Sequence, residues 1–355
     1  MIELNKAKEI IKKIAEKQQN KVLVDNSSII YTTNDFSLHL KALKNYLSFV
    51  LDIDKIHFIE NNIKLQDEKI KINEKVEIPY HKYEVEYYPI IAERREEDEK
   101  LLFAITVERL LNLLQYNFTR KDEKVFPLSF FLIETNTKEI KVISTDGRRL
   151  CVAKTEYASH ENKQIFIHKE HIQKLLKILK IIDDKNTIIG VYEGRNYLLF
   201  RTNKEEISFF IKKYDIDFPS YEKVFPSEEP KCIFAIPYPK QLLSFLKKIC
   251  EINKHNFPIQ IDVYDKLIIK YETEIDVIEE FPVAFNSKIE NPHIHLNPMF
   301  LLDVLKAIKN DKYISIEVKY YDKHTPLQLS YVIPSVFSTR YTFLIAPITC
   351  NCNEK

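Results

Sequence analysis

Residues Glu134–Leu150 read ETNTKEIKVISTDGRRL, and their pattern predicts a strand, a turn, a second strand and a second turn. Apolar residues alternate with polar ones from Ile140 to Val142, as they do in a strand with one buried face. The second turn contains Gly147, one of only 3 glycines in 355 residues. Glycine used this rarely indicates a backbone conformation that only glycine adopts at low cost.

Apolar stripes typical of helices recur on both sides of this stretch. Apolar residues at positions i, i+3, i+4 and i+7 mark a helix with one buried face. Strand-like segments lie between the stripes, at Ile140–Ile143, Tyr197–Phe200, Ile259–Val263 and Ile314–Val318. Each repeated unit is therefore one helix followed by several strands. The stripes are Ala7/Ile10/Ile11/Ile14, Val107/Leu110/Leu111/Leu114, Ile172/Leu175/Leu176/Leu179, Leu242/Phe245/Leu246/Ile249 and Leu301/Val304/Leu305/Ile308.

Two polar segments divide the chain into pieces of similar size. Arg94–Lys100 consists only of charged residues, and Pro226–Lys231 combines charge with two prolines that lack a backbone donor. The repeated helix-and-strand units predict an α+β fold. The two linkers divide it into three domains with two such units each. A second helix of the first domain is expected near Phe49–Ile59. The predicted domains are residues 1–93, 101–226 and 231–355.

Positive charge is concentrated on the predicted helices. The formal net charge is +1, whereas the helical stretches 5–17, 168–180, 238–252 and 297–309 together carry nine more basic than acidic residues. Solvated helix faces often carry lysine, so a structural role is the alternative explanation. Equivalent basic positions on several helices of a nearly neutral protein favour contacts with the phosphates of a nucleic acid, without sequence preference. The residues expected opposite the apolar stripes are Lys12, Lys13, Arg109, Lys174, Lys177, Lys247, Lys248 and Lys306.

Composition excludes several other classes of protein. Three glycines cannot supply the Gly-rich loops that bind nucleotide phosphates. No apolar run approaches the roughly 18 residues of a membrane span, and the first residues carry charge where a signal peptide is apolar. The five scattered cysteines fit reduced thiols in a cytosol. A soluble cytoplasmic protein is therefore expected.

The sequence offers few residues for catalysis. His168 with His171, and His293 with His295, could bind a metal, but neither pair has an evident third ligand. Cys350-Asn351-Cys352 is interpreted as a terminal tail. With no catalytic Ser/His/Asp arrangement, we expect no catalytic residue, metal or cofactor, and no enzyme activity. A metal-dependent nuclease or phosphodiesterase stays open as an alternative if the scattered His and Asp residues converge.

The segment Glu134–Leu150 closely resembles the second domain of the bacterial sliding clamp, the β subunit of DNA polymerase III. Three further segments match that family in order, Phe218–Pro226, Leu301–Ala307 and Phe343–Ile348, so the resemblance covers residues 101–348. It implies three alike domains with two helices each on curved antiparallel sheets, and two protomers joined head to tail into a ring. It also implies a non-catalytic processivity factor of DNA replication that encircles duplex DNA, is placed there by a clamp loader and tethers the replicative polymerase.

The same resemblance implies a peptide-binding site. Partner proteins would insert a short peptide, with Gln followed by spaced Leu and Phe, into an apolar pocket between the second and third domains. The first domain is shorter than the second, so a clamp-derived scaffold or accessory clamp that does not encircle DNA stays open as an alternative. The site residues that the resemblance implies are Leu128, Thr145, Gly147, Arg148, Arg149, Leu150, Pro219, Lys223, Val224, Leu344, Ile345, Ala346, Pro347 and Ile348.

Overall fold

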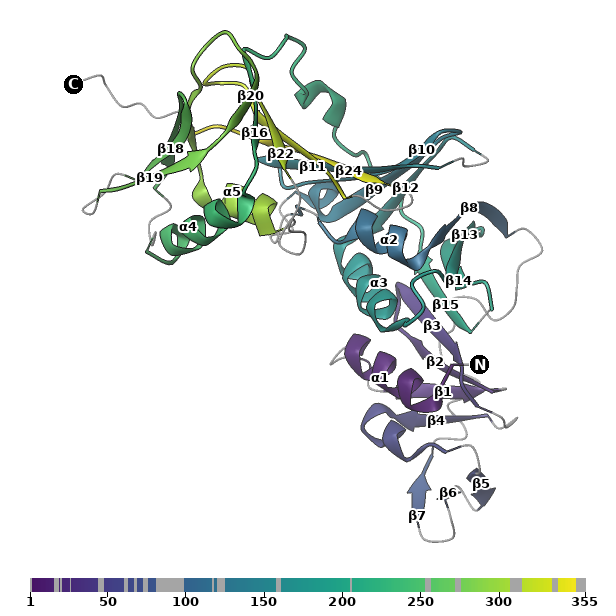
Figure 1. The fold of residues 1–355 in the computed structure, drawn as a ribbon. Coiled ribbons are helices and arrows are strands. Elements are labelled where there is room, and N and C mark those ends of the chain that lie inside the picture. Colours follow the sequence, from purple (N-terminus) through teal and green to yellow (C-terminus); the bar gives the residue numbers. More distant parts are fainter. Residues whose placement is uncertain are drawn as a thin grey trace. The chain divides into compact units, whose positions relative to one another are not determined.

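The described part of the chain contains five α-helices, three 3₁₀ helices and four antiparallel sheets (Figure 1). The α-helices are α1 (Leu4–Ile14), α2 (Val107–Leu114), α3 (Lys169–Ile181), α4 (Pro239–Ile252) and α5 (Pro298–Lys306). The structure, a computed structural model, describes residues 2–15, 19, 21–25, 27–43, 48–60, 63–66, 69–72, 76–80, 99–116, 118–119, 125–157, 161–204, 206–252, 257–271, 276–306, 315–333 and 338–348.

Two compact units make up the chain. Unit 1 comprises Met1–Asn112, Ala158–Asn162 and Phe166–Asp215, and unit 2 comprises Leu113–Tyr157, Lys163–Ile165 and Ile216–Lys355. The division into domains 1–93, 101–226 and 231–355 stays a prediction.

An eight-stranded sheet forms the core of unit 1, in the order β4-β1-β2-β3-β15-β14-β13-β8. Its neighbouring strands all pair antiparallel. The pairing of β3 with β15 joins segments about 170 residues apart in sequence, with Leu38 opposite Phe209. The strands are β1 (Lys21–Asp25), β2 (Ser28–Thr32), β3 (Phe36–Lys41), β4 (Phe49–Asp52), β8 (Lys100–Thr106), β13 (Ile188–Glu193), β14 (Tyr197–Thr202) and β15 (Ile207–Lys212), with β5 (Ile63–Gln66), β6 (Lys69–Ile72) and β7 (Val76–Pro79) in a separate three-stranded sheet.

Unit 2 contains a nine-stranded sheet in the order β12-β9-β10-β11-β24-β23-β22-β16-β20. Figure 1 shows β11 and β24 side by side within it, and Leu150 pairs with Leu344 across that ladder. The strands are β9 (Phe130–Thr135), β10 (Glu139–Thr145), β11 (Arg149–Glu156), β12 (Lys163–His168), β16 (Cys232–Ile236), β20 (Ala284–Lys288), β22 (Ile316–Tyr320), β23 (Leu327–Ile333) and β24 (Thr339–Ile345), with β17 (Ile259–Val263), β18 (Lys266–Tyr271), β19 (Val277–Pro282) and β21 (His293–Leu296) in a four-stranded sheet.

The structure confirms the α+β class and the strand–turn pattern of residues 134–150. Strands β9, β10 and β11 follow one another antiparallel, and Gly147 lies in the turn between β10 and β11 with a φ of +86°. That left-handed conformation explains the glycine, because a side chain there is strained. The helix stripes are largely confirmed as well. All four stripe residues of α1 are at most 2% exposed, whereas Leu111, Leu176 and Phe245 are only half-buried and Ile308 lies outside the described residues.

Two predictions about the first hundred residues need correction. In place of the expected helix at Phe49–Ile59, β4 pairs with β1 and is followed by the short 3₁₀ helix η1 (Ile53–Phe58), in which only Ile56 is buried. The apolar run Phe49–Leu51 is buried on both sides, which suits a strand. The charged linker is shorter than expected, because Lys100 already belongs to β8. Residues 94–98 lie outside the described residues.

Glu99, which belongs to the segment predicted to be a charged linker, has a buried side chain. Its side chain is 5% exposed. Its carboxylate accepts a 2.9 Å hydrogen bond from Tyr197 Oη and forms a 3.2 Å ion pair with Arg201 Nη1. A buried carboxylate is tolerated here because a cation and a hydroxyl replace its water.

His171 makes the stability of unit 1 depend on pH. The residue is 4% exposed at the start of α3, with its ring centroid 6.0 Å from that of Phe36 and 6.5 Å from that of Tyr214. Burial, and after it the nearby ammonium of Lys174, lowers the pKa of His171 from 6.5 to about 4. The folded protein therefore keeps this imidazole neutral at pH values where an unfolded chain would protonate it.

Replacing His171 with Phe should flatten the pH dependence of stability. In the wild type, stability is expected to fall as pH drops from about 6.5 to about 4, because only the unfolded state binds the proton in that window. The His171→Phe variant keeps an aromatic ring and should lose about 1–2 kcal/mol less than the wild type between pH 7 and pH 5. His39, whose pKa burial also lowers to about 4, should keep part of the slope. Denaturant titrations at both pH values measure it, and equal slopes would contradict the assignment.

Candidate functional site

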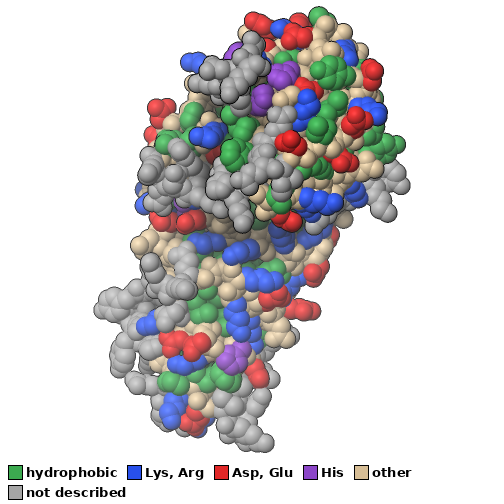
Figure 2. Space-filling model, turned by 90° about the vertical axis from the view of Figure 1, so that its left-hand side faces the viewer, with side chains coloured by type: hydrophobic (Ala, Val, Ile, Leu, Met, Phe, Trp, Pro, Cys, Tyr) green, Lys and Arg blue, Asp and Glu red, His purple; other side chains and the backbone are tan. Residues whose placement is uncertain are grey.

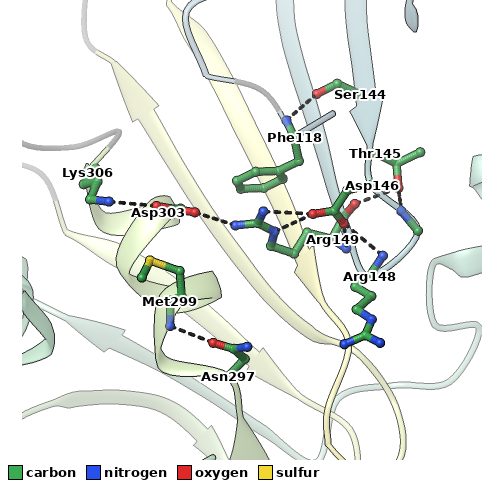
Figure 3. A network of polar contacts seen from close by, with 11 residues as sticks. Phe118, Ser144, Thr145, Asp146, Arg148, Arg149, Asn297, Met299, Asp303 and Lys306 are labelled. Atoms are coloured by element: carbon green, nitrogen blue, oxygen red, sulfur yellow. Dashed lines mark hydrogen bonds and ion pairs between the residues drawn. The ribbon is translucent and has the colours of Figure 1, made fainter. Parts of the chain in front are cut away.

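The turn between β10 and β11 is held by its own side chains. Asp146 Oδ1 accepts the backbone N–H groups of Arg148 and Arg149 at 3.0 and 2.8 Å. Thr145 Oγ1 donates to the Arg149 carbonyl at 2.7 Å and accepts the Gly147 N–H at 3.1 Å. A Cβ at Gly147 would lie 3.4 Å from Leu128 Cδ1, so the turn packs directly against that leucine. The backbone from Thr145 to Arg149 therefore has a defined conformation without any partner (Figure 3).

Arg149 connects this turn to helix α5. Its Nε and Nη2 donate to Asp146 Oδ2 at 3.0 and 2.8 Å, and its Nη1 donates to Asp303 Oδ2 at 2.7 Å. The guanidinium carbon lies 4.3 Å from the ring centroid of Phe118 and 4.4 Å from that of Phe300. Two aromatic rings and two carboxylates thus contact the Arg149 guanidinium inside unit 2, and all three of its nitrogens donate.

The end of the C-terminal strand lies beside the same turn. Ile345 of β24 pairs with Arg149 of β11, and the Ala346 N–H donates to the Arg148 carbonyl at 2.9 Å. Two residues after Ala346, the Ile348 N–H donates to the His295 carbonyl at 2.8 Å. The structure therefore brings together two segments of the predicted peptide-binding site, Thr145–Leu150 and Leu344–Ile348, along with Leu128.

Several predicted peptide-binding residues are buried in the core of unit 2. Leu128, Leu150 and Leu344 are 7%, 3% and 2% exposed, and Ile345 is fully buried. Leu150 and Ile345 therefore present no open apolar surface in this conformation, and their role in peptide binding stays a prediction. The exposed members of the set are Gly147, Arg148, Pro219, Lys223 and Val224.

The 3₁₀ helix η3 (Tyr221–Val224) is anchored to β9. Tyr221 is 6% exposed and its hydroxyl donates to Glu134 Oε2 at 2.7 Å. That contact leaves the next residues of η3 at the surface, where Val224 is 47% exposed. An exposed valine beside charged Lys223 is one of the apolar positions that a partner could cover.

Sequence reasoning missed four residues that build the turn: Asp146, Phe118, Phe300 and Asp303. Asp146 could have been found, because an Asp before Gly in a turn commonly accepts backbone N–H groups two and three residues later. Asp303 pairs with a residue 154 positions away, and nothing in a single sequence indicates that partner.

The basic residues of the helices fall into two groups. Lys12, Lys13, Lys177, Lys248 and Lys306 are exposed and Lys247 is half-buried, and their contact with phosphates stays a prediction.

Arg109 and Lys174 are only 6% and 8% exposed, so placing them on the outer helix faces was wrong. Lys174 lies with Nζ 3.7 Å from the ring centroid of Phe36, an arrangement in which the ring face attracts the cation. Arg109 belongs to α2, where Val107, Leu110 and Leu113 are also buried, so this short helix is enclosed on more than one side.

Helices α1 and α3 place their exposed lysines close together in unit 1. The two helices contact each other, and Lys177 Nζ donates to the Lys13 carbonyl at 3.1 Å. Lys6 of α1 also forms an ion pair with Asp183, which follows α3. In unit 2, α4 packs on α5, which carry Lys248 and Lys306. Figure 2 shows groups of Lys and Arg side chains (blue) with acidic side chains (red) around them on one face of the molecule.

The described residues contain no group of three His, Cys, Asp or Glu side chains that could hold a metal ion. His293 instead hydrogen-bonds through Nδ1 to the buried carboxylate of Asp262 at 2.6 Å. Burial alone would raise the pKa of Asp262, but hydrogen bonds from His293, Gln260 and Lys270 outweigh it and lower the pKa. Cys350 and Cys352 lie outside the described residues. Across the ranges that the structure describes, no helix is both long and apolar enough to cross a membrane.

Comparisons with known proteins place this chain beside the bacterial sliding clamps. No protein-family model matches it. The chain is 19% identical to the Beta sliding clamp of Streptococcus pneumoniae over 289 residues, which cover 81% of this chain and 74% of that protein. It is 23% identical to the Beta sliding clamp of Pseudomonas aeruginosa over 212 residues, and these cover 58% of this chain and 55% of that protein. That second match spans little more than half of the relative.

Solved structures share the fold over nearly the whole chain. The DNA polymerase III β subunit of Thermotoga maritima superposes with a TM-score of 0.80 at 19% identity, covering 98% of this chain and 97% of that one. The β subunit from the DNA polymerase of Streptococcus pyogenes gives a TM-score of 0.81 at 14% identity, with 97% of each chain covered. These likenesses show that this chain has the clamp fold. At such low identity they show the fold alone.

Proposed function

Since the chain is a divergent member of the bacterial sliding clamp family, we propose that it is a DNA polymerase processivity factor. In this function two protomers close head to tail into a ring around duplex DNA. The ring tethers the replicative polymerase through a short peptide of that enzyme and performs no chemistry itself. A heterologous interface generates such a finite ring when its rotation closes after two copies.

The observation that carries the proposal is the clamp fold over 98% of this chain, combined with exposed lysines on four of the five α-helices that the structure describes. Lysine ammonium groups bind phosphates as point charges and carry no sequence information. A protein that slides on any DNA sequence needs contacts of this kind. Lys12, Lys177, Lys247 and Lys306 are the residues that we assign to DNA, together with Lys13 and Lys248.

The peptide-binding part of the proposal rests on the turn Thr145–Arg149 and the end of β24. Exposed Gly147 and Arg148 lie on a hydrogen-bonded turn, and Ala346 is tied to that turn through its backbone. An extended peptide binds well to a preformed surface, because less conformational entropy is then lost on binding. Lys223, Val224 and Pro219 would extend this surface.

Retention on circular DNA tests this function, because a ring is held by topology and a surface-bound protein by affinity alone. A scaffold that never encircles DNA would leave circular and linear molecules equally fast.

A further inference from the structure

The two neighbouring arginines of the β10–β11 turn have different surroundings. Arg148 is exposed, and its backbone N–H is bound by Asp146 Oδ1. The Arg149 side chain is only 13% exposed. All three nitrogens of the Arg149 guanidinium already donate within the protein, so fewer donors are left for a partner, and the two residues should have different roles.

Arg149 and its four neighbours Asp146, Asp303, Phe118 and Phe300, here called the Arg149 cluster, join two distant segments of the chain. Asp146 and Asp303 each present one carboxylate oxygen to the guanidinium, at 2.8 and 2.7 Å. The ring centroids of Phe118 and Phe300 lie 4.3 and 4.4 Å from its central carbon, and Figure 3 shows the Phe118 ring beside it. Charge-assisted hydrogen bonds at low exposure are strong and directional, and ring stacking excludes water from them.

Helix α5 contributes two residues to the Arg149 cluster, and both lie on one face of the helix. Phe300 and Asp303 are three residues apart, which places them on the same side of a helix. The first turn of α5 is set by Asn297, whose Oδ1 accepts the Met299 N–H at 2.9 Å. The position of α5 and the position of the turn are therefore linked through a single side chain.

Within the turn, Asp146 has a double task. One oxygen accepts the backbone N–H groups of Arg148 and Arg149, and the other accepts the Arg149 guanidinium. The orientation of the Asp146 carboxylate thus depends on Arg149, and the backbone conformation of the turn depends on Asp146. A change at Asp303 would reach the turn through this chain of contacts.

We propose that Arg149 is a positioning residue of the peptide-binding site: anchored by Asp303 and Phe300, it orders the turn that a partner peptide contacts and does not bind the peptide itself. The inference rests on the proposed function. Asp303 also binds Lys306 Nζ through its second oxygen at 2.9 Å. The Asp303 carboxylate is therefore shared between Arg149 and Lys306, a lysine that we assign to DNA.

Peptide affinity in three variants tests the proposal: Arg149→Gln, Asp303→Asn and the double variant. The probe is a synthetic peptide with a Gln followed by spaced Leu and Phe, titrated by calorimetry. Asp303→Asn should weaken binding about tenfold although Asp303 is not a predicted peptide contact, and the double variant should be no weaker than Arg149→Gln alone. Arg149→Lys should not restore affinity, because one ammonium cannot replace the planar fork between two carboxylates. Lys154→Gln, at the far end of β11, is the matched control and should bind as the wild type does.

Unchanged affinity of Asp303→Asn, or additive losses in the double variant, would overturn the proposal and indicate direct contact between Arg149 and the peptide. Amide hydrogen exchange of Gly147, Arg148 and Arg149 gives an independent readout in the free protein. Exchange should be at least about tenfold faster in Asp303→Asn than in the wild type. If the wild type binds no such peptide, the peptide part of the proposed function fails. Hydrogen exchange alone then tests whether the Arg149 cluster orders the turn, and equal exchange rates in the variant and the wild type would contradict it.

Discussion

Changing Lys12, Lys177, Lys247 and Lys306 together to Glu is expected to lower the affinity for duplex DNA by at least about a hundredfold at low salt. The four substitutions replace four positive charges with four negative ones on helices α1, α3, α4 and α5. For each phosphate contact that is lost, fewer counterions are released from the DNA on binding. The plot of log affinity against log salt concentration should therefore become shallower, by roughly 0.9 in slope per contact.

Fluorescence anisotropy with a labelled duplex measures both quantities. The matched control changes four exposed lysines that lie outside the α-helices to Glu, so that the net charge is altered equally: Lys138, Lys204, Lys266 and Lys323. This control should lose much less affinity, since its lysines are not assigned to DNA. An equal loss in both variants would mean that net charge alone governs binding, and that the helices have no special role.

Replacing Ile345 with Asp is expected to destabilise the fold by about 3–5 kcal/mol, because it places a charge without a partner in the core. Ile345 is fully buried and pairs with Arg149 across the β11–β24 ladder. The substitution therefore acts on folding before it acts on any peptide, and Leu150→Asp should do the same. Urea denaturation followed by circular dichroism measures the loss.

Val224→Asp is the matched surface variant. Val224 is 47% exposed, so its change to Asp should leave the free energy of unfolding within about 0.5 kcal/mol of the wild type. It should weaken peptide binding if η3 borders the site. A fully stable Ile345→Asp variant would contradict the burial of this strand, and unchanged peptide affinity in Val224→Asp would remove η3 from the site.

The hairpin around Gly147 was predictable because its information is local. Alternation of apolar residues and one glycine in a glycine-poor chain are enough to predict two strands and a left-handed turn. The apolar helix stripes were predictable for the same reason. Pairings such as β3 with β15 or Arg149 with Asp303 depend on distant segments, and a single sequence carries no signal for them.

The errors on charged residues have a common physical cause. Arg109, Lys174 and Glu99 are charged residues that the sequence predicts at the surface, yet each has a low-exposure side chain. Lys174 is accommodated on an aromatic ring, and Glu99 is accommodated by Arg201 and Tyr197. Angular position on a helix predicts which residues oppose the apolar stripe, but it does not predict whether a second element covers that side.

Retention on DNA of defined topology tests the central claim, encirclement, most directly. After a clamp loader places the protein on a nicked circle, it should stay bound at a salt concentration that abolishes direct binding to linear duplex, and one cut through that circle should release it within the time that diffusion to an end requires. The mass of the free protein under the same conditions should be about 84 kDa, twice the 42.2 kDa of one chain. Equal retention on circular and linear DNA at that salt concentration would contradict encirclement.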